Sequence, residues 1–142
     1  MNAREVVDVV YRTLSEKGVD ALAELVAPDV TFVAADGARI EGREKALDYL
    51  RRERAALNLV EDVSIVAEGE SVVVLEGVVR GKHDAELTLP SGRHLPATGR
   101  EISLELVVVA RVANGRITHV RRYYDRLGLM AQLGIALGPP SA

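Results

Sequence analysis

The Asn114-Gly115 pair is the feature that most constrains the fold, because Asn-Gly is a strong signal for a two-residue β-hairpin turn. Residues typical of strands lie on both sides of it, in Arg100–Val112 and in Ile117–Asp125. The sequence therefore predicts two long antiparallel strands. Asp125 closes the second strand, and Leu127–Leu133 is expected to form a short apolar helix or turn.

The segments before this hairpin divide into a helical part and a strand part. The expected elements are helices at Arg4–Lys17, Asp20–Ala27 and Gly42–Arg54, a small hairpin of Val30–Ala35 with Ala38–Glu41, and long strands at Asn58–Ala67 and Ser71–Lys82. His83–Ala97 is expected to be a polar connection. This order predicts an α+β fold: a cone-shaped barrel of a strongly curved, mostly antiparallel sheet, packed against three N-terminal helices and enclosing a pocket.

Composition excludes several classes of protein. The 142 residues fit a single domain over 1–142, with 137–142 expected to be a flexible tail after a Gly-Pro-Pro break. A net charge of −3 gives no indication of a basic surface that would bind nucleic acid. Without cysteine there is no disulfide, thiol nucleophile or thiolate metal site. Apolar runs are too short to span a membrane and the N-terminus is charged, so we expect a cytoplasmic protein with no membrane partner.

The last predicted strand carries an unusual set of polar side chains. Because strand side chains alternate between faces, one face carries Ile117, His119, Arg121, Tyr123 and Asp125. The opposite face carries Thr118, Val120, Arg122 and Tyr124. The alternation leaves open which face is concave. Val120, Arg122 and Tyr124 are the candidates for a convex dimer surface.

A set of motif residues carries a family resemblance. In order they are Glu41-Gly42-Arg43, Gly81, His83, Pro96, Thr98-Gly99-Arg100, Gly115, Ile117, Asp125, Gly128, Leu129, Gln132, Leu133 and Gly134. The chain thereby resembles the SnoaL-like polyketide cyclases of the nuclear-transport-factor-2-like and ketosteroid-isomerase-like superfamily. The resemblance implies a deep pocket, a homodimer formed through the convex sheet face, and an intramolecular aldol cyclisation that uses no metal and no cofactor.

The resemblance also implies a catalytic pair. The family's acid/base Asp at the end of the last strand corresponds to Asp125, and its His after the earlier long strand corresponds to His83. Proton removal next to a carbonyl needs a base of near-neutral pKa in a dry pocket, and burial raises a carboxyl pKa toward that range. The alternative for Asp125 is a helix N-cap. The alternative for His83 is a loop residue at the strand end.

Arg121, Tyr123 and His119 are the expected substrate-binding residues if their face is concave. Arg121 could bind a substrate carboxylate or stabilise an enolate, or it could pair with Glu76 or Glu105 across the sheet. Tyr123 could line the pocket or simply pack. Family members usually carry Glu and Trp where this chain has His119 and Arg121. The three histidines lack metal-ligand spacing, so no metal is expected.

These observations predict a cofactor-independent enzyme of cyclase or isomerase type. It would perform acid/base chemistry on a hydrophobic, carbonyl-bearing small molecule, such as the intramolecular aldol cyclisation of a polyketide. Two alternatives stay open. One is hydrolysis of the epoxide-opening type in the same pocket. The other is a non-catalytic module that binds a small molecule.

Overall fold

The computed structural model of the chain describes residues 1–136, so the tail predicted at 137–142 lies outside the described residues. The N-terminal elements are helix α1 (Ala3–Lys17), the 3-10 helix η1 (Val19–Leu25), strands β1 (Val26–Val33) and β2 (Arg39–Glu41), and helix α2 (Arg43–Leu57). They are followed by strands β3 (Val60–Glu68), β4 (Val72–Lys82), β5 (Leu87–Thr88), β6 (His94–Leu95), β7 (Glu101–Ala113) and β8 (Arg116–Tyr124), and by helix α3 (Arg126–Leu133).

Local sequence signals set most of these boundaries. Asn2 caps the start of α1, because its side chain accepts a hydrogen bond of 2.8 Å from the Glu5 backbone N–H. Gly18, which has a φ of 89°, caps its end. The strand expected from Val30 begins earlier, at Val26, and therefore contains Pro28. Proline has no N–H to donate, and the pairing of β1 with β8 is irregular between Val26 and Thr31, the interval that contains Pro28.

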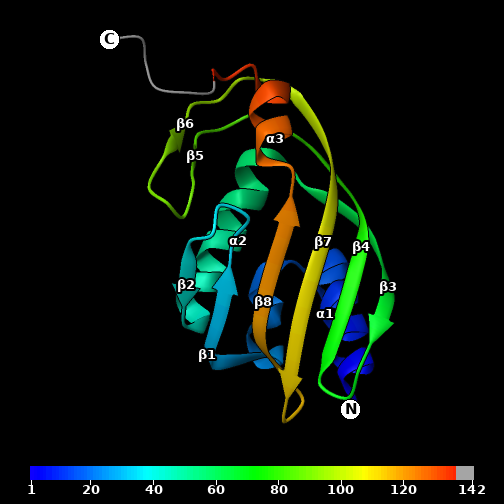
Figure 1. Cartoon of the computed structure of the whole chain (residues 1–142). Helices are drawn as coiled ribbons and strands as arrows, with labels where there is room; N and C mark the ends of the chain where they lie inside the picture. The colour runs from blue at the N-terminus through cyan, green and yellow to red at the C-terminus, as the bar shows by residue number, and fades with distance from the viewer. Residues whose placement is uncertain (137–142) are drawn as a thin grey trace.

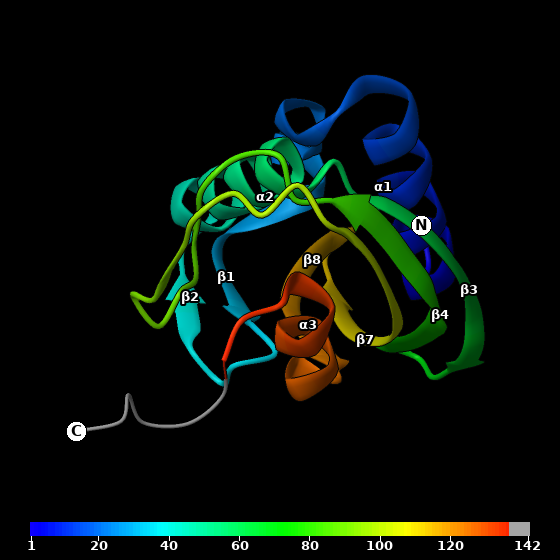
Figure 2. The same cartoon turned by 90° about the horizontal axis from the view of Figure 1, so that it is seen from above.

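The sheet has six strands in the order β2-β1-β8-β7-β4-β3. The expected antiparallel meander forms its larger part, from β3 to β8. β1 pairs with β8 in parallel, which makes the sheet mixed. α1 and α2 lie behind it (Figure 1), and the view from above shows the sheet curving around them like an open cone (Figure 2). The α+β fold class is confirmed; the barrel is not closed, since β2 and β3 are its edges.

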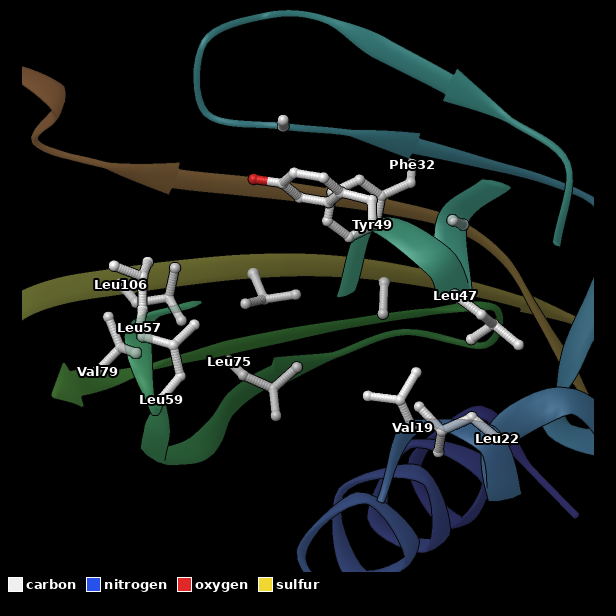
Figure 3. Close-up of a cluster of buried hydrophobic side chains, with 14 of the residues drawn as sticks. Val19, Leu22, Phe32, Leu47, Tyr49, Leu57, Leu59, Leu75, Val79 and Leu106 are labelled. Atoms are coloured by element: carbon white, nitrogen blue, oxygen red, sulfur yellow. The ribbon is translucent and has the colours of Figure 1, made fainter. Parts of the chain in front are cut away.

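Two glycines of β4 explain part of the curvature. A Cβ at Gly77 would collide with the Asp62 carbonyl oxygen of β3, and a Cβ at Gly81 would collide with the Leu57 carbonyl oxygen at the end of α2. The backbones approach this closely only because both residues lack a side chain. The concave face of the sheet and the helices share one apolar core, part of which is drawn in Figure 3.

The alternation on β8 is interrupted, which reverses the faces expected from Ile117. Ile117 pairs with Val112 on β7, but His119 pairs with Arg111, so Thr118 is an extra residue on β8. Such a bulge moves every later side chain to the other face of the sheet. As a result Arg122 is buried, while Arg121 lies on the outside. The expectation that Val120, Arg122 and Tyr124 belong to the convex surface is wrong, because all three side chains line inner cavities.

Candidate active site

An apolar cavity of about 90 Å³ lies between the two long helices and the concave face of the sheet. Aliphatic and aromatic side chains form most of its wall, with Val7 from α1, Leu47 from α2, Phe32 from β1 and Val108 from β7 among them. Four lining residues carry polar side chains: Tyr11, Arg54, Glu61 and Arg122. A mostly dry wall with a few convergent polar groups is the usual form of a small-molecule site.

A second, wider hollow adjoins this cavity at the gap between α1 and β3. It measures about 250 Å³ and shares Tyr11, Leu14, Arg54 and Glu61 with the inner cavity; the rest of its wall is Ser15, Leu59 and Val60. A small hollow of about 20 Å³, lined partly by Tyr124, lies beyond Arg122. Glu61 lines all three hollows and therefore stands at their junction.

Arg122 is held in a fixed position by Glu53 of α2. Its Nη1 and Nη2 donate to Glu53 Oε1 and Oε2 at 2.9 and 2.7 Å, and the Tyr49 hydroxyl donates to Oε2 at 2.8 Å. The guanidinium carbon lies 4.9 Å from the centroid of the Phe32 ring. Tyr49 and Phe32 lie next to each other in Figure 3. Burial lowers the pKa of Arg122. The charge and the hydrogen bonds of Glu53, with smaller contributions from Tyr49 and Tyr124, more than offset this effect, so the pKa is raised and the guanidinium stays charged.

Glu61 projects from β3 on the same face as Val63 and Ile65. Burial raises the pKa of this carboxyl, while the nearby Arg122 and Arg54 partly offset the rise. Glu53 adds a smaller upward contribution. A carboxyl group with a raised pKa beside an apolar cavity can accept and return a proton closer to neutral pH than an exposed one.

Tyr11 of α1 is the other candidate for chemistry. Burial raises the pKa of its phenol, and the charge of Glu61 raises it further. Arg122 and Arg54 oppose this effect without cancelling it. The phenol is therefore a neutral hydrogen-bond donor at physiological pH, and it borders both the inner cavity and the wider hollow.

The structure places all five expected site residues away from the cavity, since none of them lines it. Asp125 is exposed, and its Oδ1 accepts a 2.8 Å hydrogen bond from the Gly128 N–H as the N-cap of α3. His119 is exposed on the outer face of β8. Arg121 lies on the same face, 5.0 Å above the ring of Tyr123, which is 48% exposed. The catalytic and binding roles assigned to these residues stay predictions.

His83 is fully buried at the end of β4. Its Nδ1 lies 3.1 Å from the Thr98 hydroxyl, its backbone N–H donates to Arg100 O at 2.9 Å, and its carbonyl accepts from Gly99 N at 2.8 Å. Arg100 in turn packs against Gly134 at the end of α3. Contacts through His83 and Arg100 thus connect the Thr98-Gly99-Arg100 motif to Gly134. Gly134 ends α3, which lies at the end of the sheet where β8 finishes (Figure 1).

Sequence reasoning missed Glu61, Tyr11 and the Glu53–Arg122 pair, although signals were present. Glu61 interrupts an otherwise apolar face of its strand. Tyr49 and Glu53 are four residues apart on the apolar side of a helix, where they can contact each other. A carboxylate in such a position requires a partner, and Arg122 provides it.

Residues 1–136 contain no group of three or more His, Cys, Asp or Glu side chains arranged to hold a metal ion. In the same range no helix has both the length and the apolar character needed to cross a membrane.

Comparison with known proteins places the chain in a family. The sequence model of the SnoaL-like polyketide cyclases matches residues 4–133, and the chain belongs to this family. A proposed polyketide cyclase from Xanthomonas campestris pv. campestris is 27% identical, with a TM-score of 0.77 over 92% of this chain and 96% of that one. IdmH, a proposed polyketide cyclase from Streptomyces antibioticus, is 23% identical, with a TM-score of 0.73 over 95% and 100%.

A third solved structure supports the fold. It is a protein of ketosteroid-isomerase-like fold from Catenulispora acidiphila, solved with trimethylamine, that is 24% identical, with a TM-score of 0.69 over 95% of this chain and 98% of that one. A search of curated proteins gives no significant sequence match.

Proposed function

We propose that this member of the family is a cofactor-independent enzyme that moves a proton on a hydrophobic, carbonyl-bearing small molecule. The observation that carries the proposal is the position of Glu61, a carboxyl group with a raised pKa at the edge of an apolar cavity. Cyclisation by aldol condensation and isomerisation of a ketone both begin with removal of a proton next to a carbonyl. The family membership favours one of these reactions over unrelated chemistry.

In this proposal three of the four polar residues of the cavity have separate roles. Glu61 removes the proton, and the electron pair of the broken C–H bond moves toward the carbonyl oxygen. The Tyr11 phenol donates a hydrogen bond to that oxygen as its negative charge develops. The fixed Arg122 guanidinium adds a positive field near the cavity without titrating. In isomerisation Glu61 then returns the proton to another carbon of the enolate. In cyclisation the enolate carbon attacks a second carbonyl carbon of the same molecule, whose C=O π bond opens to an alkoxide that takes the proton from Glu61.

Exchange of α-protons for deuterium tests the proposal without knowledge of the natural substrate. Cyclopentanone in D₂O is followed by proton NMR with wild-type protein, Glu61→Gln and Asp62→Asn. Asp62 is the next residue on β3 and faces solvent, which makes it a matched control. We expect wild type and Asp62→Asn to accelerate exchange, and Glu61→Gln to lose on the order of 10²-fold or more. Equal rates in wild type and Glu61→Gln contradict the assignment.

The pairing of Asp125 with His83 is the competing assignment from the sequence. It requires α3 to release its N-cap so that the carboxylate can reach a substrate. The same exchange assay with Asp125→Asn and His83→Gln compares the two assignments directly, since each predicts a different inactive variant.

Hydrolysis is the second candidate function, and one arrangement favours it. The Arg122 guanidinium is bound by one carboxylate, Glu53, and shares the inner cavity with another, Glu61. Carboxylates beside a fixed cation can hold and activate a water for attack on an epoxide. Incubation of cyclopentene oxide in ¹⁸O-labelled water distinguishes the two functions: incorporation of label into a diol that depends on Glu61 supports hydrolysis.

A module that only binds its ligand would behave differently in both assays. It would retain cyclopentanone or the epoxide, detectable by ligand-observed NMR, with no exchange and no diol. This result would exclude both enzymatic proposals for these probes.

A further inference from the structure

The wider hollow between α1 and β3 gives the cavity a second compartment of different character. The inner cavity is apolar and small, below the roughly 150 Å³ of a cavity known to hold benzene. It therefore fits a ligand portion no larger than one small ring or a short branched chain. The outer compartment is wider and more polar, since Ser15, Arg54 and Glu61 contribute to its wall. Val60 stands on its rim with 66% of its surface exposed.

Arg54 borders both compartments and supplies the positive charge in the wall of the outer one. One of its terminal nitrogens donates to the Leu59 carbonyl at 3.3 Å. Among residues 1–136 no carboxylate lies within the 4.0 Å ion-pair distance of its guanidinium. Its neighbours on α2 differ, because Arg51 and Arg52 are exposed and pair with Asp48.

A half-buried arginine without an ionic partner is suited to bind an anion. Its guanidinium has five N–H groups, and a single one donates to protein within the described residues. The planar fork of donors matches the two oxygens of a carboxylate. Burial raises the pKa of Glu61 and the Arg54 charge offsets part of this rise, so the two groups interact, but no Glu61 oxygen lies within ion-pair distance of the guanidinium. The carbonyl groups at the end of α2 add only partial negative charges.

We propose that the outer compartment is a subsite for the anionic end of the ligand, with Arg54 as its recognition residue. This inference rests on the proposed function and narrows the substrate class to hydrophobic keto acids. The carbonyl end occupies the inner cavity beside Tyr11 and Glu61, and the carboxylate lies in the outer compartment against Arg54. The shared wall of the two hollows, formed by Tyr11, Leu14, Arg54 and Glu61, makes one continuous path for such a molecule.

A pair of probes that differ in charge alone tests the subsite. The dissociation constants of 5-oxohexanoate and its neutral amide, 5-oxohexanamide, are measured by NMR titration with wild type, Arg54→Gln, Arg54→Lys and Arg52→Gln. We expect wild type and Arg52→Gln to bind the carboxylate about tenfold more tightly than the amide, as one charge-assisted contact would provide. Arg54→Gln should lose this preference, and Arg54→Lys should retain part of it.

Three results would overturn the inference: equal binding of the two probes by wild type, no measurable binding of either, or a preference that survives in Arg54→Gln. If Arg54→Gln does not fold, as judged by circular dichroism, two measurements on wild type test the inference instead. They are its preference for the carboxylate probe over the amide and the change of that preference with salt concentration. A preference from Arg54 must weaken as ionic strength rises.

The result is separable from the proposed function. Exchange on cyclopentanone requires Glu61 and no anionic group on the substrate. The exchange assay can therefore fail while the carboxylate preference is observed, and exchange can be observed while the carboxylate preference is absent.

Discussion

At the scale of single residues, the site depends on titratable groups that the fold withdraws from water. Glu61 illustrates the cost of such a position, because burial raises the pKa of its carboxyl above that of an exposed glutamate. Glu53 solves the same problem differently, through a bidentate pair with Arg122 and a hydrogen bond from Tyr49. Glu61 is therefore able to exchange protons, whereas the Glu53 carboxylate is held in place by its partners.

The raised pKa of Glu61 has a consequence for stability. When a carboxyl group has a higher pKa in the folded than in the unfolded chain, the folded protein becomes less stable as the pH rises from the unfolded pKa through the folded pKa. We therefore expect Glu61→Gln to melt at a higher temperature than wild type at pH 7, and the difference to vanish near pH 3. Thermal unfolding followed by circular dichroism over this range checks the prediction. A variant that is less stable at pH 7 would contradict it.

The Glu53–Arg122 pair gives a second prediction. Arg122→Met leaves Glu53 buried without its partner, which should lower the free energy of unfolding by about 3–5 kcal/mol. The double variant Arg122→Met/Glu53→Met removes both charges and should recover most of that loss. Urea unfolding of the single and double variants measures both quantities. If the double variant is no more stable than the single one, the pair is not coupled as the structure indicates.

At the scale of elements, the bulge in β8 decides which side chains reach the cavity. The long helices, the long strands and the Asn114-Gly115 turn could be predicted from local signals such as apolar periodicity and turn residues. The short strands β5 and β6 lie in the segment expected to be a polar connection, and β1 begins inside the expected second helix. The bulge at Thr118 could not, because it depends on how β7 and β8 pair rather than on either strand alone. For this reason the fold class could be predicted, but the β8 side chains expected on the inner face, His119, Arg121 and Tyr123, lie on the outer face.

The family motifs at the end of the chain act on α3. Asp125 caps the helix, and Gly128 leaves room for the capping side chain, since a Cβ there would lie 2.6 Å from Asp125 Oδ2. Asp125→Ala should therefore cost about 1 kcal/mol of stability, whereas Asp125→Asn, which can also cap, should cost a few tenths. Chemical denaturation of the two variants checks this order. Equal losses would indicate that the carboxylate has another role.

At the scale of the whole molecule, we propose that two copies associate through the outer face of the sheet. Its centre is partly buried and apolar, with Val74, Val107 and Val109 on adjacent strands beside the exposed Tyr123. Charges of both signs surround this centre, from Glu76 and Glu105 to Arg111 and Arg121. A patch with both signs can complement a second copy of itself across a two-fold axis.

Light scattering after gel filtration tests the association. We expect wild type to have twice the chain mass of 15.3 kDa and Val107→Glu to have the mass of one chain, because a carboxylate in the centre of the patch is desolvated without a partner. Arg12→Glu, on the exposed surface of α1, is the control and should leave the mass unchanged. A wild-type mass of one chain would contradict the proposal.

The measurement that tests the central claim most directly is α-proton exchange on cyclopentanone in D₂O with Glu61→Gln and Asp125→Asn compared side by side. If proton transfer takes place in the apolar cavity, Glu61→Gln loses exchange activity while Asp125→Asn retains it, and both variants keep the circular dichroism spectrum of wild type. The reverse pattern, with activity lost in Asp125→Asn and retained in Glu61→Gln, would contradict the account and place the chemistry at the end of β8.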